Sequence, residues 1–585
     1  MSYLQTRVIP NAIVFISGLC IMVVELVAGR LVAKHIGSSL YTWTSIIGVI
    51  LAGISIGNWL GGKLADRYRP EGMLGFLFLI SSALTLSMLW LENVVGADLM
   101  KLVNSTLSTN AEMSWPLRTA ATVALVFFWP ACALGTISPV VAKMALDRSQ
   151  QVGSTVGNIY AWGTAGSIIG TFLTGFFLIS FVGTRGVICS VAGLLAFMGV
   201  LLGSQQWLLQ GTWAGLVIAV VLPTVRDLPA MIRIGALLRS RDDVTTETVT
   251  DDQGELRDVV VKTRDYHDES NYYAVTVYDQ SLEVYDTRAR RDLGLQSVKV
   301  LTLDHLVHSY VWLGHPEMLA YDYEHIYASV TERVSGGEGK PLKTLFIGGG
   351  GYSFPRFIEA VYPRSAVHVA EIDPAVTKAA HEVLGLPGDT SIVTTHGDAR
   401  NFVDDTVRRN RAARRAGKDP MLYDYIYGDA FNDFSVPWHL TTLEFNQKLK
   451  EIMTPDGVYL INLIDIYPLP ELKDGQRTFD KGLGRFLAAF INTANQVFGH
   501  TDVFSTDLHS LSKDRDTFVV ACSTRHLDLD DLGRNGEREF RGYRLSESEI
   551  KDLLNLHPPT DWRNILTDDF APVDNMLAEV VKRGR

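Results

Sequence analysis

Cysteine is scarce in this chain. Its 585 residues include only four cysteines, and three of them, Cys20, Cys132 and Cys189, fall within long apolar runs. Cys522 stands alone in the more polar remainder, so no disulfide framework can form there. The sequence also lacks a CxxC pair and an HExxH motif. These absences argue against a structural zinc site and against a zincin-type protease, and we predict no metal site.

The second part of the chain also lacks an excess of basic residues. Residues 1–239 hold 14 Lys and Arg against 8 Asp and Glu, whereas the whole chain has a formal net charge of −11. The remainder is therefore strongly acidic. An acidic domain repels a phosphate backbone, so we expect no nucleic-acid partner.

Long apolar runs fill the first part instead. A transmembrane helix needs roughly 20 apolar residues to cross a bilayer. The first run is too long for a signal peptide and contains Glu25 and Arg30, so we expect it to remain as a span. Residues 1–240 are predicted to form an α-helical polytopic membrane domain with the lipid bilayer as its partner. The candidate spans are residues 11–33, 41–62, 73–92, 119–141, 155–182 and 186–204, with a shorter seventh run at 211–225.

Basic residues between these runs set an expected orientation. Lys63, Arg67 and Arg69 follow the second run, and Lys143 and Arg148 follow the fourth. The positive-inside rule places both connections, and with them the N-terminus, in the cytoplasm. Seven crossings would leave the remainder outside the cell, whereas six or eight would leave it in the cytoplasm. The seventh run is then re-entrant, or an eighth crossing lies near residues 228–238.

The remainder is predicted to be a globular α/β domain preceded by a smaller β unit. Residues 241–340 contain a polar linker and the segment YYAVTVYDQSLEVYDT, which alternates apolar and polar residues about a central turn. This pattern is typical of a β-hairpin. From residue 341 to 585, strands such as TLFIG, AVHVA, YDYIYGD and GVYLINLID alternate with helical segments. Such alternation indicates a Rossmann-like, methyltransferase-type fold.

Four glycines and two acids follow the first strands of this domain. The glycines let a ligand approach the backbone closely, and an acid at the end of the second strand can accept both ribose hydroxyls. A later acid can accept an adenine amino group, and helix capping is the alternative for both acids. The pattern predicts an adenosyl ligand, S-adenosylmethionine or a derivative. The candidate ligand-binding residues are Gly348, Gly349, Gly350, Glu371 and Asp398.

A further acid, Asp429, follows the apolar strand residues 425–427. Ligands of open parallel sheets bind outside the carboxyl ends of the strands, so we expect Asp429 beside the same ligand. A carboxylate there can take a proton from an ammonium nucleophile. Asp429 is therefore the candidate catalytic base, with a loop cap or a solvated acid as the alternative.

These residues resemble the spermidine synthase family of polyamine aminopropyltransferases, and in particular bacterial fusions of a membrane domain to a spermidine-synthase-like domain. The resemblance rests on PACALGTISPVVAK in the first part and on IGGGGYSFPR, EIDP, GDAR, YGDAFND and LTDDFAPVDNML in the second. It implies transfer of an aminopropyl group from decarboxylated S-adenosylmethionine to a small-molecule amine, with release of methylthioadenosine and no permanently bound cofactor. It also implies the bacterial inner membrane, with the soluble domain in the cytoplasm, and it leaves a homodimer open.

The resemblance assigns roles to single residues unevenly. It implies that Glu371 binds ribose, that Asp398 binds adenine and that Asp429 deprotonates the attacking amine. His325 matches the histidine of the family's Tyr-His pair, although Glu324 stands where the tyrosine is expected. The other substrate-binding candidates, for which a surface acid is the alternative, are Asp433 and Asp465.

The glycine loop departs from the family pattern. The soluble enzymes have three glycines, then Asp, then two glycines, whereas Gly351, Tyr352 and Ser353 fill the last three positions here. The missing carboxylate would attract the donor's ammonium and repel the carboxylate of intact S-adenosylmethionine. Methyl or amino-carboxypropyl transfer from intact S-adenosylmethionine is therefore open. A transporter with an adenosyl- or polyamine-sensing domain is the alternative from another class.

Overall fold

The computed structural model divides into two compact units. The first comprises residues 1–240 with 269–272, and the second comprises residues 241–268 with 273–585. Each unit has a buried core of its own. The structure describes residues 8–36, 40–94, 115–148, 151–203, 244–250, 256–304, 306–431, 436–473, 476–508, 510–512, 514–534 and 536–583.

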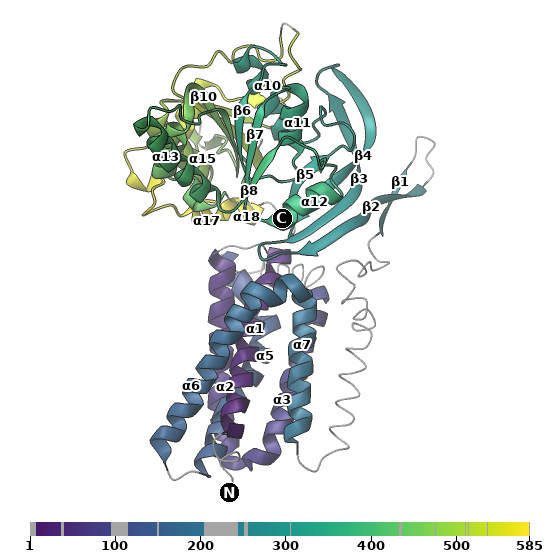
Figure 1. Cartoon of the computed structure of the whole chain (residues 1–585), viewed down its shortest axis with the longest axis vertical. Helices are drawn as coiled ribbons and strands as arrows, with labels where there is room; N and C mark the ends of the chain where they lie inside the picture. The colour runs from purple at the N-terminus through teal and green to yellow at the C-terminus, as the bar shows by residue number, and fades with distance from the viewer. Residues whose placement is uncertain are drawn as a thin grey trace. The chain divides into compact units, whose positions relative to one another are not determined.

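The first unit is built from long apolar helices (Figure 1). Six of its described helices are long and apolar enough to cross a membrane, which agrees with the six full-length apolar runs. The seventh run at 211–225 and the segment 228–238 lie outside the described residues. The helices are α1 (Ile9–Ile36), α2 (Leu40–Arg67), α3 (Pro70–Val94), α5 (Trp115–Leu146), α6 (Val152–Leu173) and α7 (Ile179–Leu202), with the short π-helix η3 (Thr174–Leu178) between the last two.

Glycines allow these helices to pack closely. A Cβ atom added at Gly57 of α2 would lie 2.2 Å from the carbonyl oxygen of Cys132 in α5. Glycine permits such backbone contact, which is a common way for helices to associate in lipid. Large apolar side chains face outward, and Trp59, Trp129 and Phe181 are 59%, 59% and 81% exposed. An exterior of this kind suits lipid better than water.

The second unit begins with a five-stranded sheet whose strands are neighbours in sequence order. Its strands are β1 (Val244–Thr250), β2 (Leu256–Glu269), β3 (Ala274–Asp286), β4 (Arg291–Leu303) and β5 (Leu306–Val311). This sheet agrees with the predicted small β unit ahead of the α/β fold.

The hairpin predicted inside YYAVTVYDQSLEVYDT is wrong. The segment forms one continuous strand, β3, and Ser281 in its middle pairs with Ser297 of β4. The chain turns later, at residues 287–290, where Arg290 has a φ of +54°. The polar residues that suggested a turn occupy partly exposed positions of a long strand.

The larger sheet of the second unit has eight strands in the order β15-β13-β14-β10-β9-β6-β7-β8. The strands from β10 to β8 in this order run parallel, whereas β13, β14 and β15 pair antiparallel. The strands are β6 (Lys343–Ile347), β7 (Ala366–Glu371), β8 (Val393–His396), β9 (Tyr423–Gly428), β10 (Met453–Asp465), β13 (His500–Ser505), β14 (Asp516–Ser523) and β15 (Tyr543–Arg544), and a separate pair is β11 (Glu471–Lys473) with β12 (Gln476–Thr478).

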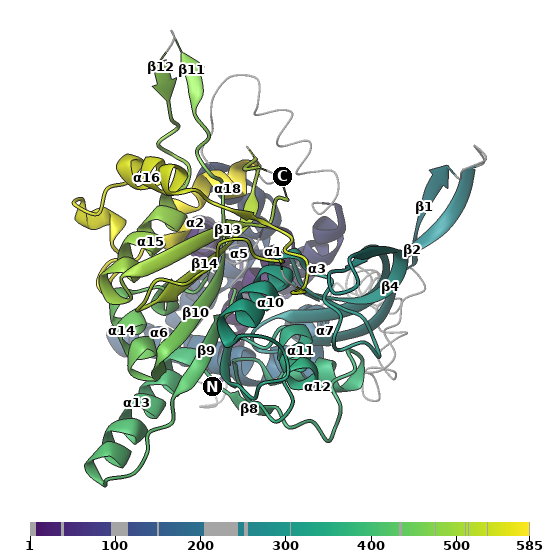
Figure 2. The same cartoon turned by 90° about the horizontal axis from the view of Figure 1, so that it is seen from above.

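Helices cover both faces of this sheet (Figure 2). The helices within residues 322–382 pack on one face, and those within residues 399–497 pack on the other. This layered arrangement is the predicted Rossmann-like, methyltransferase-type fold. The helices are α10 (Asp322–Ser335), α11 (Ser353–Val361), α12 (Pro374–Glu382), α13 (Ala399–Arg415), α14 (Leu443–Glu451), α15 (Arg485–Val497), α16 (Glu547–Leu556), α17 (Val573–Met576) and α18 (Ala578–Arg583), with 3-10 turns at Trp438–Leu440 and Trp562–Asn564.

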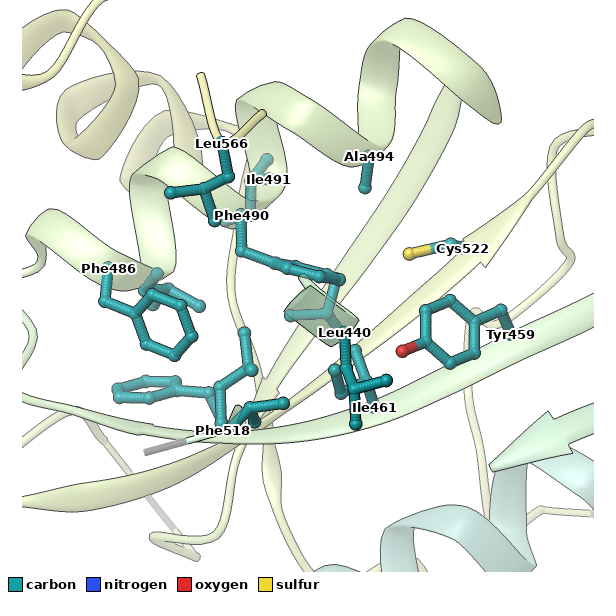
Figure 3. Close-up of a cluster of buried hydrophobic side chains, with 14 of the residues drawn as sticks. Leu440, Tyr459, Ile461, Phe486, Phe490, Ile491, Ala494, Phe518, Cys522 and Leu566 are labelled. Carbon is teal, nitrogen blue, oxygen red and sulfur yellow. The ribbon is translucent and has the colours of Figure 1, made fainter. Parts of the chain in front are cut away.

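Alternate side chains of the central strands point to opposite faces of the sheet and pack into two separate cores. Tyr459 and Ile461 of β10 pack with Phe490 of α15 on one face (Figure 3). Val458 and Leu460 of the same strand belong to the core on the opposite face. A strand segment buried on both faces is expected to be apolar, as residues 458–461 of β10 are. The ends of the central strands are therefore held by a core on each face of the sheet.

Candidate active site

The carboxyl ends of three neighbouring parallel strands bring predicted site residues together. The strands β7, β6 and β9 lie side by side in the sheet. Gly348 follows β6, Glu371 ends β7 and Asp429 follows β9. Since these strands run in the same direction, the three residues share one edge, which is where open α/β sheets bind ligands.

The glycine loop packs directly against the end of β9. Gly348 has a φ of +97°, and a Cβ atom there would lie 2.4 Å from the backbone oxygen of Asp429. Gly350 also has a positive φ, of 48°. Side chains rarely accept this backbone conformation, so both positions favour glycine.

Glu371 holds the glycine loop in place. Its Oε2 accepts a hydrogen bond from the Gly349 N–H at 2.7 Å, and its Oε1 accepts one from the Asp373 N–H at 2.8 Å. The residue is only 6% exposed, and burial raises the pKa of its carboxyl group to about 7. Each carboxylate oxygen has capacity for a second hydrogen bond, so a bound hydroxyl can still be accepted.

Asp429 is held by two neutral donors. The Tyr323 hydroxyl of α10 donates to Oδ2 at 2.8 Å, and the Asn462 side-chain amide of β10 donates to Oδ1 at 2.7 Å. Burial raises the pKa of the Asp429 carboxyl group to about 7 against the opposing effect of these bonds, and the charge of Glu371 adds to the rise. A carboxyl group with such a pKa suits proton transfer near neutral pH.

Asp398 caps α13 and also faces a histidine. Its Oδ1 accepts hydrogen bonds from the backbone N–H groups of Arg400 and Asn401, at 2.9 and 3.2 Å. Its Oδ2 lies 2.9 Å from Nε2 of His439, and this hydrogen bond is the main reason that the pKa of Asp398 stays below its usual range. The Gly397 N–H donates to the carbonyl oxygen of Glu371 at 2.9 Å, which fixes Asp398 beside the end of β7.

Sequence reasoning missed Tyr323 and Asn462. The tyrosine that contacts Asp429 lies two positions before His325, not at position 324 where the family comparison expected it. Asn462 is a polar side chain within the apolar run VYLINLI of β10, and this exception was the signal that could have found it. Strand β10 is buried on both faces, so a polar side chain within it needs a partner.

His325 is not among the residues that hydrogen-bond to Asp429. It is buried, and its Nδ1 has no hydrogen-bond partner among the residues that the structure describes. Burial lowers the pKa of its imidazole to about 3, and the charges of Arg538 and Arg541 contribute. Its role in substrate binding stays a prediction that these contacts do not support.

Of the other two predicted substrate-binding acids, Asp465 and Asp433, the structure describes only Asp465. Asp465 ends β10 and is buried, and it accepts hydrogen bonds from the backbone N–H groups of Ile466 at 2.7 Å and Leu487 at 2.9 Å. These bonds tie the strand to the start of α15, so they support a structural role, and substrate contact by Asp465 stays a prediction. Asp433 lies outside the described residues.

Gly351 stands where the family pattern has an acid, and strand β5 fills the space that a side chain would need there. A Cβ atom at Gly351 would lie 2.6 Å from Oγ and 2.7 Å from Cβ of Ser309 in β5. The Ser309 hydroxyl is itself 3.0 Å from the hydroxyl of Ser353. Ser353 in turn donates a hydrogen bond to the carboxylate of Glu324.

Tyr352 replaces a glycine of the family pattern but keeps a glycine-like backbone. Its φ is +57°. The buried side chain is anchored by hydrogen bonds between its hydroxyl group and those of Thr377 at 2.9 Å and Thr394 at 3.1 Å. These contacts stabilise a backbone conformation that is unfavourable for a tyrosine.

Known proteins resemble the second unit. No protein-family model matches the chain. The polyamine aminopropyltransferase of Vibrio vulnificus is 34% identical over 123 residues, which are 21% of this chain and 38% of that protein. A probable polyamine aminopropyl transferase of Bifidobacterium longum is 25% identical over 237 residues, which are 39% of this chain and 48% of that protein. The C-terminal part of this chain is homologous to the polyamine aminopropyltransferases.

The aminopropyltransferase-like unit also resembles a methyltransferase. The eEF1A lysine and N-terminal methyltransferase of Bos taurus is 31% identical over 125 residues, 21% of this chain and 18% of that protein. A solved structure of a probable spermidine synthase from Corynebacterium glutamicum is 18% identical, covering 49% of this chain and 92% of that one, with a TM-score of 0.38. The chain spans less than half the length of these curated relatives.

We expect Gly351→Ala to destabilise the aminopropyltransferase-like unit by about 1–3 kcal/mol, because the added methyl group overpacks the contact with Ser309. Thermal unfolding measures the loss. Gly388→Ala is the matched control, since its added Cβ would meet no atom within 4 Å. Adding Ser309→Gly to Gly351→Ala should recover part of the stability, and equal unfolding temperatures for the two alanine variants would contradict the close contact.

Proposed function

We propose that this protein is a membrane-anchored transferase of the aminopropyltransferase type, which moves an aminopropyl-type group from decarboxylated S-adenosylmethionine to an amine. The observation that carries the proposal is Asp429, a buried carboxyl group with a pKa of about 7 beside the glycine loop. Tyr323 and Asn462 hold it in one orientation. The homology of the C-terminal part to polyamine aminopropyltransferases supports the same class of reaction.

The proposed reaction is a displacement at carbon. The Asp429 carboxylate takes a proton from the acceptor ammonium, and the freed amine attacks the methylene carbon attached to the donor's sulfonium. A C–N bond forms while the C–S bond breaks, and the electron pair stays on sulfur as the neutral thioether methylthioadenosine. The product nitrogen carries the positive charge that sulfur loses. The protein contributes mainly position and a base, because the sulfonium already activates the carbon.

The donor's nucleoside is assigned to the glycine loop and the acids around it. Glu371 has acceptor capacity beyond its two backbone donors, and we assign it to the ribose hydroxyls. Asp398 is assigned to the adenine amino group, with His439 beside it. Gly350 leaves the backbone open to close approach, whereas a Cβ atom at Gly349 would lie 2.8 Å from the Tyr352 ring. The donor is then a co-substrate, and no permanently bound cofactor is required.

Methyl transfer from intact S-adenosylmethionine is the second candidate. Gly351 removes a carboxylate that would repel the carboxylate of that donor, and a relative named as a methyltransferase matches a similar length of this chain. The same base and nucleoside site would serve both reactions. The two differ in the nucleoside released, which is methylthioadenosine for aminopropyl transfer and adenosylhomocysteine for methyl transfer.

Incubation of the purified full-length protein with each donor and a panel of amines separates these reactions. We expect methylthioadenosine to form from decarboxylated S-adenosylmethionine only when an amine is present, with the nucleoside product identified by mass spectrometry. Release of adenosylhomocysteine from intact S-adenosylmethionine would establish methyl transfer instead. No nucleoside product from either donor would refute the proposed function.

Asp429→Asn should lower turnover by roughly 10²–10⁴, because the amide keeps the shape and removes the basicity. In the wild type, kcat/KM should fall about tenfold per pH unit below pH 7, since only the ionised carboxylate is a base. The Tyr323 hydrogen bond lowers the pKa of Asp429, so Tyr323→Phe should move this acid limb to higher pH. Near-normal turnover in Asp429→Asn would remove Asp429 from the role of base.

We also propose that the first unit anchors the protein in a bacterial inner membrane, with the transferase unit in the cytoplasm. Six helices of spanning length and outward-facing aromatic side chains such as Trp129 and Phe181 support insertion in lipid. The basic connections Lys63–Arg69 and Lys143–Arg148 support their cytoplasmic placement. An even number of crossings then brings the chain after α7 to the same side, where S-adenosylmethionine is made.

Cysteine labelling of intact cells tests this topology on a background that lacks all four native cysteines. Arg69→Cys, Asp147→Cys and Asp456→Cys should react with a membrane-impermeant thiol reagent only after permeabilisation. Ser108→Cys, between the third and fourth spans, should react without permeabilisation and serves as the positive control. Labelling of Asp456→Cys from outside, with Arg69→Cys protected, would place the transferase unit outside the cytoplasm.

A further inference from the structure

Glu324 is a buried acid that the proposed reaction leaves unused. It lies in the first turn of α10 and is 1% exposed. One carboxylate oxygen, Oε1, accepts a hydrogen bond from the Ser353 hydroxyl. The other, Oε2, is buried and has no hydrogen-bond partner among the described residues. Buried carboxylates are normally paired or fully hydrogen-bonded, so the unpaired oxygen calls for a partner from outside this set.

The neighbours of Glu324 connect it to the candidate base and to the helix that follows the glycine loop. The preceding residue, Tyr323, donates its hydroxyl hydrogen to Asp429 at 2.8 Å. Ser353, which holds Oε1, begins α11 immediately after the glycine loop. Glu324 is also close enough to Asp429 for the charge of Asp429 to raise its pKa, so this acid lies near the place where a donor bound on the loop would meet Asp429.

The glycine loop has no room for a side chain at position 351 unless Ser309 moves. A Cβ atom at Gly351 would lie 2.6 Å from the Ser309 hydroxyl oxygen, and a longer side chain would need still more room. The same Ser309 hydroxyl contacts Ser353 at 3.0 Å. Ser309, which fills the space beside Gly351, thus contacts Ser353, and Ser353 hydrogen-bonds to Glu324.

We propose that Glu324 is a specificity-determining residue that binds the primary ammonium at the end of the donor's three-carbon chain. This inference rests on the proposed function and deepens it. A carboxylate pairs strongly with an ammonium group and repels another carboxylate. Glu324 would therefore favour decarboxylated over intact S-adenosylmethionine, and supply from α10 the negative charge that Gly351 cannot provide.

The electrostatics of the site agree with a cationic partner. Burial raises the pKa of the Glu324 carboxyl group to about 8, and the negative charge of Asp429 adds to the rise. The hydrogen bond from Ser353 and a weaker effect of the Tyr321 backbone oppose this rise. A cation bound beside Glu324 would offset the negative charge of Asp429 that acts on it, and so would favour the ionised form of Glu324.

Calorimetry on the full-length protein tests the proposal with two nucleosides. The probe 5′-deoxy-5′-(3-aminopropylthio)adenosine carries the primary ammonium, and 5′-methylthioadenosine lacks it. We expect Glu324→Gln to weaken binding of the aminopropyl thioether by about tenfold to a hundredfold, as removal of a buried charge pair does, and to leave methylthioadenosine within about twofold. Glu317→Gln, the same change at an exposed position before α10, should alter neither affinity.

The remaining outcomes separate the sources of the ammonium. Loss of 1,4-diaminobutane binding in the presence of saturating methylthioadenosine, with the aminopropyl thioether unaffected, would assign Glu324 to the acceptor and overturn the donor assignment. Equal weakening of both nucleosides would also overturn it, because that pattern indicates a structural role. Failure of the wild type to bind either nucleoside would instead refute the proposed function.

A second variant covers the case in which Glu324→Gln does not fold. Ser353→Ala keeps the carboxylate but removes the donor that orients it. We expect a smaller loss of affinity, of about threefold to tenfold, for the aminopropyl thioether only. Unchanged affinity of a folded Ser353→Ala for both nucleosides, with Glu324→Gln unfolded, would overturn the proposal.

Discussion

The hydrogen bond from the Gly349 N–H to the buried carboxylate of Glu371 is the contact on which the site depends. It joins the loop after β6 to the end of β7, and the Gly397 N–H joins the same residue to the loop after β8. The first glycine then packs against the backbone of Asp429 after β9. Glu371 thus joins the end of β7 to the loops after β6 and β8, through its carboxylate and its backbone carbonyl, and the loop it holds packs against the end of β9.

Much of this site follows from local sequence. Glycines and acids placed directly after apolar strands predict a ligand edge, because parallel strands bring their carboxyl ends together. Gly348, Glu371 and Asp429 are found at that edge for this reason. The order of elements also indicates the layered fold, since buried strands and intervening helices leave distinct periodicities in the chain.

The contacts that hold the candidate base were not predictable in the same way. Tyr323 lies 106 residues before Asp429 in the sequence, and their contact depends on how α10 packs across the sheet. Asn462 reaches Asp429 from the adjacent strand, 33 residues away. No local pattern encodes such pairs. The misplaced hairpin has a related cause, because polar residues at exposed positions of β3 look like a turn until the partner strand is known.

Tyr352 has a consequence for the thermodynamics of ligand binding. Its left-handed backbone is held by a buried ring and by hydroxyl contacts to α12 and β8. A glycine at that position would leave the loop free to sample many conformations. The tyrosine removes that freedom in the unliganded protein, so binding of the proposed nucleoside would cost less conformational entropy. The loop is then preorganised, and entropy should oppose binding of the proposed nucleoside less than in a relative with a glycine at this position.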